Sequence, residues 1–408
     1  MAAQSSIQGA LIPVAEARAR ILATLTATVP ERVALAKALG RVLAEDVIAQ
    51  RTQPPSDLSA MDGYAVRAAD VSTVPAKLRV VGEAAAGGAY DRALGEGEAV
   101  RIFTGAPLPD GADALVIQED TERYGDVVIA REAAVAGAHV RVAGLDFKAG
   151  ATGLRAGRRL SSADVAFAAA MNVPAIIAHR KPKIAFFSTG NELVMPGSEP
   201  GPHQIVSANN DGLAALIEEA GGVPFDLGII ADDTRAIQSA GRHALDCEML
   251  VTLGGASVGD HDLVQGALAE DGLNVDFWRI AMRPGKPLMF GRYREMPMLG
   301  LPGNPVSALV CAHLFLMPAI AALQGGTPRI RTALAKLGRN LPENDRREDY
   351  LRATLAEADG ELPVATPFSK QDSSMLSLIS AADCLVIRPP HSPAAKAGDV
   401  AKVMLLRW

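Results

Sequence analysis

The alternation of short apolar runs with helical segments over residues 183–323 restricts the possible folds more than any other sequence feature. Six runs have the length and composition of buried strands: 183–189, 225–231, 248–255, 275–280, 287–291 and 297–301. Helical patterns lie between or after them: 207–222, 233–246, 260–272 and a longer one from Pro305. Because such alternation produces a largely parallel sheet covered on both faces, we predict a doubly wound α/β domain.

The flanking sequence predicts further domains, since 408 residues exceed what one core usually organises. Helical patterns at 7–25, 31–44 and 161–179 predict an extended helical segment that serves as a linker domain. Short β-like runs separated by Gly, Pro and Asp predict an inserted small β domain and a C-terminal β domain. The predicted boundaries are 1–52 with 141–180, 53–140, 181–327 and 328–408.

Charge and cysteine content favour a cytoplasmic protein that binds neither nucleic acid nor membranes. The net charge of −6 argues against a general nucleic-acid binder. Three cysteines, far apart and without a CxxC pair, are typical of a reducing cytosol. The apolar run 306–323 is long enough to raise the question of a membrane span. It follows a helix-start signal at Asn304-Pro305, which favours a buried helix.

Four loops follow strands of the predicted α/β domain, where ligands of such sheets bind. They are STGNEL (188–193), the Asp pair 232–233, GGASVGDHD (254–262) and LPGNPVSA (301–308). Glycines allow close approach of the backbone to a ligand, and a helix that starts at Asn304-Pro305 offers free N–H groups to an anion. Plain turns and helix caps are the alternative; one of the two Asp residues, and Asp260, are expected caps. No Walker or GxGxxG signature occurs.

The same loops and their neighbours carry charges of both signs. Arg279, Arg283 and Lys286 lie within eight residues and favour an oxyanion site over a solvated surface run. Glu192, Asp232 and Asp262 would crowd together if the loops converge. Two carboxylates about 5 Å apart repel by roughly 3 kcal/mol at an effective dielectric constant near 20. Mg²⁺ bridging the carboxylates and an anionic substrate would resolve this repulsion.

The predicted β domain contributes two tight turns, SAMDGYAV (59–66) and FTGAPLPDGADALVIQE (103–119). Asp62-Gly63 is a strong turn dipeptide, so a simple hairpin is the alternative to a functional loop. Asp146, in GLDFKAG, lies where the chain leaves this domain.

Seven motifs occur in the order found in the MoeA/gephyrin-E family of molybdenum insertases, which the whole chain resembles. They are SAMDGYAV, IFTGAPLPDGADALVIQE, STGNEL, GIIADD, GGASVGDHD, RPGKP and LPGNPVSA. The resemblance implies four domains, with a MogA-like molybdopterin-binding α/β domain and a barrel-like C-terminal domain. It implies a homodimer whose cleft joins the α/β domain of one subunit to the β domain of the other. It also implies Mg²⁺-dependent transfer of molybdate into adenylylated molybdopterin, with AMP released.

The resemblance also assigns roles to residues, motif by motif. It implies catalytic roles for Asp62, Asp146, Glu192, Asp232 and Asp262, the last three also as metal ligands. Substrate-binding roles follow for Thr104, Ser188, Thr189, Gly190, Gly254, Gly255, Ser257, Arg279, Arg283, Lys286, Pro302, Gly303, Asn304, Pro305 and Ser373. Asn191 stands where the family often has Asp, and Asp372 where Gly is more usual. No single carboxylate stands out as the general base.

Two other functions stay open at this point. The α/β domain also resembles that of molybdopterin adenylyltransferases, although the 53–140 and 328–408 segments argue against this reading. A non-catalytic, gephyrin-like scaffold is the second alternative, and the retained acids Glu192, Asp232 and Asp262 argue against it.

Overall fold

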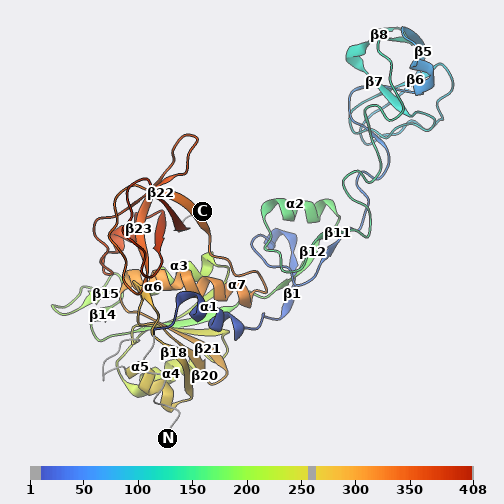
Figure 1. Cartoon of the computed structure of the whole chain (residues 1–408). Helices are drawn as coiled ribbons and strands as arrows, with labels where there is room; N and C mark the ends of the chain where they lie inside the picture. Colours follow the sequence, from blue (N-terminus) through green and yellow to red (C-terminus); the bar gives the residue numbers. More distant parts are fainter. Residues whose placement is uncertain (1–10, 256–262, 407–408) are drawn as a thin grey trace.

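The computed structural model describes residues 11–255 and 263–406. A body holds the α/β domain and the C-terminal domain, and a thin arm carries a small β domain at its far end (Figure 1). The structure confirms the predicted multidomain class, with a doubly wound α/β domain, an inserted β domain and a barrel-like C-terminal domain.

A six-stranded sheet in the order β16-β13-β17-β21-β20-β18 forms the centre of the body. Its strands are β13 (Lys183–Thr189), β16 (Val223–Ile230), β17 (Met249–Leu253), β18 (Leu273–Trp278), β20 (Met289–Tyr293) and β21 (Met296–Leu301). Strands β16, β13, β17 and β21 are parallel, whereas β20 is antiparallel to both of its neighbours. All six strands expected from the apolar runs are therefore present.

Helices cover both faces of this sheet. On one face α3 (Asn209–Glu219), α6 (Pro305–Cys311) and α7 (Met317–Leu323) pack on β13 and β17, together with α1 (Val14–Ala23). On the other face lie α4 (Thr234–His243) and α5 (Leu263–Glu270). The stretch Pro305–Leu323 is long and apolar enough to cross a membrane by length and composition, but 72% of its most apolar window is buried. This burial confirms the predicted core helix.

The C-terminal domain is a closed five-stranded barrel. Its strands are β22 (Thr332–Leu337), β23 (Glu348–Ala356), β24 (Val364–Pro367), β25 (Cys384–Arg388) and β26 (Val400–Leu405). Pairing of β23 with β25 closes the ring, so the barrel strands leave no free sheet edge. The short β19 (Met282–Arg283) of the α/β domain pairs with β23, and the helix α8 (Leu376–Ser380) lies between β24 and β25 in the chain.

The inserted β domain is a six-stranded sheet in the order β7-β4-β6-β5-β9-β8. The strands are β4 (Gly63–Val66), β5 (Ala76–Ala84), β6 (Glu98–Ile102), β7 (Ala114–Ile117), β8 (Thr121–Tyr124) and β9 (Val127–Ala130). Gly63 does not lie in a simple hairpin, because β4 pairs with β6 and β7. A Cβ on Gly63 would lie 2.1 Å from the Val116 carbonyl oxygen, so close strand approach requires this glycine.

The arm corrects the prediction of an extended helical segment, because paired strands form most of it. Three antiparallel pairs follow one another: β1 (Pro30–Ala34) with β12 (Ala175–His179), β2 (Val47–Ile48) with β11 (Thr152–Leu154), and β3 (Leu58–Ser59) with β10 (Val140–Arg141). The helix predicted over 31–44 is wrong, since Val33 and Ile176 are buried across the β1–β12 pair.

The helix predicted over 161–179 is correct only in its first half, as α2 (Ser162–Ala170). It ends before Asn172, whose φ is +64°, and Pro174 lacks the N–H that a continuing helix needs. The helix predicted over 7–25 begins only after Pro13.

Candidate functional site

The loops after β13, β17 and β21 meet at the carboxyl edge of the central sheet. The strand order reverses between β13 and β17, and ligands of open α/β sheets bind at such a switch point. The Gly254 N–H donates to the Leu301 carbonyl at 3.1 Å, and Asn209 Nδ2 donates to the Gly303 carbonyl at 2.8 Å. A Cβ on Gly254 would lie 3.2 Å from the Thr189 carbonyl oxygen. The loops therefore converge, the condition under which their charged residues would lie close together.

The Asp pair after β16 divides into a helix cap and an available carboxylate. Asp233 caps α4 by accepting a hydrogen bond from the Ala236 N–H at 2.9 Å, as predicted for one of the two. Asp232 instead accepts from the Asn191 N–H at 3.1 Å. The Asn191 backbone thus holds the loop after β13 against the loop after β16. Glu192 is exposed on the same loop, so two carboxylates occupy neighbouring loops.

The Glu192 carboxylate lies against Gly190, two residues earlier in the chain. Gly190 has a φ of +147°, and a Cβ there would lie 2.7 Å from both Glu192 carboxylate oxygens. Any other residue at position 190 would therefore displace the Glu192 side chain. Thr189 and Gly190 lie at this edge as predicted.

Of the three predicted metal ligands, only Glu192 and Asp232 lie among the described residues. Ser257, Asp260 and Asp262 lie outside the described residues, and Gly255 is the last one described before them. Within residues 11–255 and 263–406, no group of three His, Cys, Asp or Glu side chains could hold a metal. The two exposed carboxylates of Glu192 and Asp232 still suit Mg²⁺, which commonly keeps several waters and takes one or two carboxylates plus substrate phosphates.

Asn210, which the sequence reading missed, fixes the end of β13. Its side-chain oxygen accepts from Ser188 Oγ at 2.5 Å, and its Nδ2 donates to Asp226 Oδ1 at 2.8 Å. Ser207 Oγ also donates to this oxygen at 3.3 Å, and α3 has no side-chain cap. The predicted binding residue Ser188 is fully buried, so its hydroxyl acts inside this network. The available signal was an amide in the first turn of a helix, where Asn is a poor helix former.

The first turn of α6 joins the barrel domain to the same edge. Asn304, predicted as a side-chain cap, makes no such bond; its Nδ2 donates to Ser373 Oγ at 3.1 Å. The Val306 N–H donates to the Ser373 carbonyl at 3.1 Å, which provides the missing acceptor. Pro305 is the first helical residue as predicted, and Pro302 is buried. Asp372 accepts hydrogen bonds from the Ser374 N–H and hydroxyl, and these lower its pKa.

The three basic residues near β18 have different surroundings. Arg279 follows β18, stacks on the Trp278 ring at 5.0 Å and has a φ of +85°. Its Nε is buried without a hydrogen-bond partner in the described part of the chain, a donor left for a ligand. Arg283 Nε donates to Asp349 Oδ1 at 2.9 Å, and this pairing raises the pKa of Arg283. Lys286 is exposed. Of the three, Arg279 best fits an oxyanion clamp, whereas Arg283 links the barrel to the α/β domain.

A second cluster of predicted residues lies in the small β domain. Asp62 Oδ1 accepts from the Thr104 N–H at 2.7 Å and from Thr104 Oγ1 at 2.8 Å. These two bonds lower the pKa of Asp62, the backbone bond most, and nearby Arg101 adds to the effect. Asp62 is therefore an ionised, oriented carboxylate at neutral pH.

Arg101 is a further residue that sequence reasoning missed in this cluster. Its guanidinium donates to the Gly63 carbonyl at 3.0 Å and to Gln118 Oε1 at 2.7 Å. It also stacks on Phe103 at 4.8 Å and on Tyr64 at 5.2 Å. Arg101 thus contacts the residue that follows Asp62 and the residue that precedes Thr104. A basic side chain within the apolar strand β6 was the available signal.

Within one chain the structure does not bring the two clusters together. Asp62 and Thr104 lie in the small domain at the tip of the arm, and the loops of Glu192 and Asp232 lie on the body (Figure 1). Asp146 lies in the arm near the small domain; it is exposed, and its N–H donates to the Gln53 carbonyl at 3.0 Å.

Comparisons with known proteins cover almost the whole chain. Residues 12–172 match the MoeA N-terminal region (domain I and II), 185–322 a probable molybdopterin binding domain, and 334–406 the MoeA C-terminal region (domain IV). A molybdopterin molybdenumtransferase of Nostoc sp. is 35% identical over 88% of this chain and 85% of its own length. The one from Bacillus subtilis is 32% identical over 97% and 94%.

One solved structure is also similar over the full length. The molybdopterin biosynthesis moeA protein from Pyrococcus horikoshii OT3 is 28% identical, with a TM-score of 0.85, over 97% of this chain and all of that one.

Proposed function

The chain belongs to the MoeA family of molybdopterin molybdenumtransferases, and we propose that it acts on adenylylated molybdopterin and molybdate in a cleft shared by two subunits. As a family member it is a transferase of molybdenum-cofactor biosynthesis. In the proposed reaction molybdenum enters the pterin dithiolene, and AMP is the leaving product. The proposal includes a cytoplasmic location, where the three buried, free cysteines stay reduced.

The convergence of the loops after β13, β16, β17 and β21 is the observation that carries this proposal. It gathers the exposed carboxylates of Glu192 and Asp232, close-packed glycines and the N-terminus of α6 at one sheet edge. A helix N-terminus and backbone N–H groups suit a phosphate or molybdate oxyanion, and the buried Arg279 Nε adds a donor that no described residue accepts. The catalytic and binding residues predicted from the motifs remain part of the proposal.

Mg²⁺ fits the proposed site, with Glu192, Asp232 and Asp262 as the carboxylates that would hold it. When bound, it supplies charge shielding for a phosphoanhydride. The protein's own contribution is to orient the substrate. The glycine loops approach its phosphates, Asn191 holds Asp232 in place, and Asp62 with Thr104 closes the site from another subunit.

A second subunit is proposed because one chain separates the two clusters. A closed homodimer of two-fold symmetry would place the small domain of each subunit against the body of the other. The arm, built of three consecutive strand pairs, holds the small domain away from the body of its own subunit (Figure 1).

The direct experiment incubates the purified chain with adenylylated molybdopterin, Mg²⁺ and molybdate or tungstate. We expect AMP release that depends on both the metal ion and the oxyanion. Glu192→Gln and Asp232→Asn should each lower the rate at least about 100-fold, the scale on which positioned charge acts. Asp233→Asn is the matched control on the same loop: Asn also caps helices, so its rate should stay near wild type.

Two outcomes would reject the proposal. AMP release that neither carboxylate substitution affects would remove this edge from the reaction. ATP-dependent adenylylation of molybdopterin by this chain alone would assign it the earlier step.

A further inference from the structure

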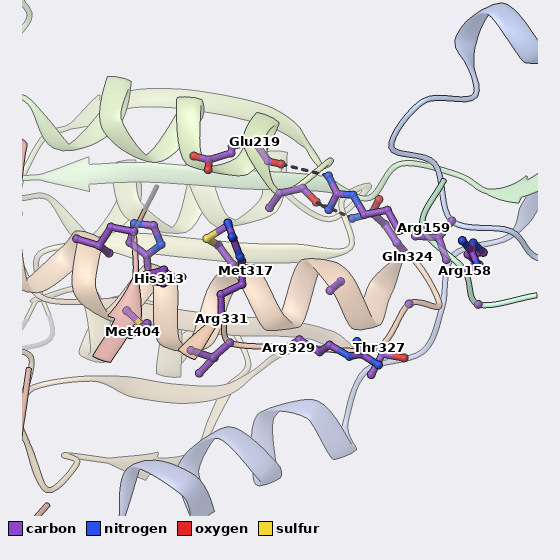
Figure 2. A pocket seen from close by; sticks show the side chains of 18 residues that line it. Arg158, Arg159, Glu219, His313, Met317, Gln324, Thr327, Arg329, Arg331 and Met404 are labelled. Carbon is purple, nitrogen blue, oxygen red and sulfur yellow. Dashed lines mark hydrogen bonds between the residues drawn. The ribbon is translucent and has the colours of Figure 1, made fainter. Parts of the chain in front are cut away.

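A cavity of about 550 Å³ lies where the arm, the α/β domain and the barrel meet, away from the carboxyl edge of the sheet. Its walls include Arg159 of the arm, the last residues of α3, the second half of the long helix, and Met404 of β26 (Figure 2). Helix α3 ends at Glu219, four residues before β16 begins, so this region is the amino edge of the sheet. The helix Pro305–Leu323, with its 19 residues, spans about 28 Å between the two edges.

The cavity is lined by more positive than negative charge, although the whole chain is negative. Four arginines line it, Arg158, Arg159, Arg329 and Arg331, against one acid, Glu219. In Figure 2, Arg329 lies below the long helix, Arg331 reaches up across it toward Met317, and Arg159 reaches toward the end of α3.

Hydrogen bonds and ion pairs within the protein neutralise only part of this positive charge. Arg159 donates to the Ala220 carbonyl at 3.2 Å and to the Glu219 carbonyl at 3.3 Å, at the end of α3. Arg158 pairs with Asp164 at 2.8 Å. The carboxyl-terminal ends of two helices supply about half a negative charge each, and the Glu219 carboxylate supplies one more. With Asp164 neutralising Arg158, about one of the four positive charges is left without compensation. Among described residues Arg329 has no hydrogen bond or ion pair of its side chain.

Much of the remaining cavity lining is apolar, and a buried hydrogen bond holds one wall in place. Met317, Ala321, Ile330 and Met404 provide apolar surface. The buried Gln324 fixes the wall, because its Nε2 donates to the Ala220 carbonyl at 2.9 Å. The helix makes a π-helical turn over Ala312–Leu316, which places His313 in the lining. Such turns occur frequently at functional sites.

We propose that this cavity binds a small organic anion with an apolar ring system and one phosphate or similar oxyanion group. Guanidinium groups pair with oxyanions in bidentate fashion, and Arg159 and Arg158 keep unused donors beyond the contacts above. The volume lies within the range of small-molecule sites, and the apolar wall suits a ring. A ligand here would touch three domains at once and would hold the base of the arm against the body.

The test measures binding of 2-naphthyl phosphate to the full-length protein by isothermal titration calorimetry. We expect saturable binding of one molecule per chain, with 2-naphthol and inorganic phosphate each binding at least about tenfold more weakly, since each has only half of the recognised chemistry. The double substitution Arg329→Gln/Arg331→Gln should weaken 2-naphthyl phosphate binding at least about tenfold. Arg346→Gln, an exposed arginine of the barrel domain, is the matched control and should leave it unchanged.

A Glu192→Gln variant separates this site from the proposed transferase cleft. It should retain full 2-naphthyl phosphate binding while losing AMP release, whereas the double arginine variant should lose the binding and retain AMP release. Binding that survives the double substitution, or that disappears with Glu192→Gln, would overturn the inference. So would equal affinity for naphthol and its phosphate, because the arginines would then contribute nothing.

Discussion

At the scale of single residues, Asp62 shows how a residue of a turn dipeptide becomes an oriented carboxylate. The sequence predicted a tight turn and, by resemblance, a catalytic carboxylate. The structure adds that Thr104 donates twice to the same carboxylate oxygen, and that Arg101 binds the Gly63 carbonyl and stacks on the Phe103 ring. Contacts of this kind join residues about forty positions apart, which no local pattern in one sequence reveals.

Thr104→Val should raise the pKa of Asp62. The substitution removes the hydroxyl donor and keeps the stronger backbone N–H bond, so the carboxylate becomes less stabilised but stays oriented. The pKa of Asp62 is lowered in the folded protein. The carboxylate therefore stays charged at pH values below the usual pKa of an aspartate, and it is protonated only as the pH falls through the lowered pKa. The acid limb of the rate of AMP release should move to higher pH in the variant. An unchanged acid limb would mean that Asp62 does not control it.

Arg101→Gln should reduce the rate of AMP release about tenfold with little loss of stability, because it removes a positioning contact and leaves Asp62 in place. Arg79→Gln, at an exposed ion pair with Glu98 in the same domain, is the control and should keep the wild-type rate. Equal rates for the two variants would show that Arg101 only stabilises the fold. Arg101→Lys should not rescue the rate fully, since one ammonium cannot replace both the fork of donors and the stacking.

At the scale of elements, apolar runs predicted all six strands of the central sheet, and glycine and proline predicted where the loops turn. The helical patterns were wrong over 31–44 and over the second half of 161–179. There β1 and β12 pair across more than 140 residues of sequence, and this tertiary pairing overrides a helical pattern. Asn304 is the N-cap residue of α6 as predicted, but its side chain bonds Ser373 of the C-terminal domain and not the helix's own N–H groups.

Asn210→Ala should lower the free energy of unfolding by about 2 kcal/mol, because it leaves Ser188 and Asp226 without their buried partner. It should also slow AMP release, since Ser188 begins the loop that carries Glu192. Denaturant unfolding measures the first effect. Asn274→Ala, at an exposed position of β18, provides the baseline. A loss no greater than that of Asn274→Ala would contradict the role assigned to the network.

At the scale of the whole molecule, the central feature is the separation of two functional clusters by the arm (Figure 1). Local sequence patterns predicted the domains individually, but neither periodicity nor spacing indicates that a site would be divided between chains. That expectation came from family resemblance. The structure supplies a physical reason to expect a shared cleft, because Asp62 and Glu192 belong to domains at opposite ends of one subunit.

Mixing two inactive variants tests the shared cleft most directly. Asp62→Ala and Glu192→Ala chains are denatured together, refolded and assayed for AMP release. If each cleft joins the small domain of one subunit to the body of the other, a mixed dimer has one cleft with both substitutions and one with neither. Random pairing should then restore about a quarter of the wild-type rate. If each cleft were built within one chain, every cleft would carry a substitution, and a mixture as inactive as its two parents would contradict the shared site.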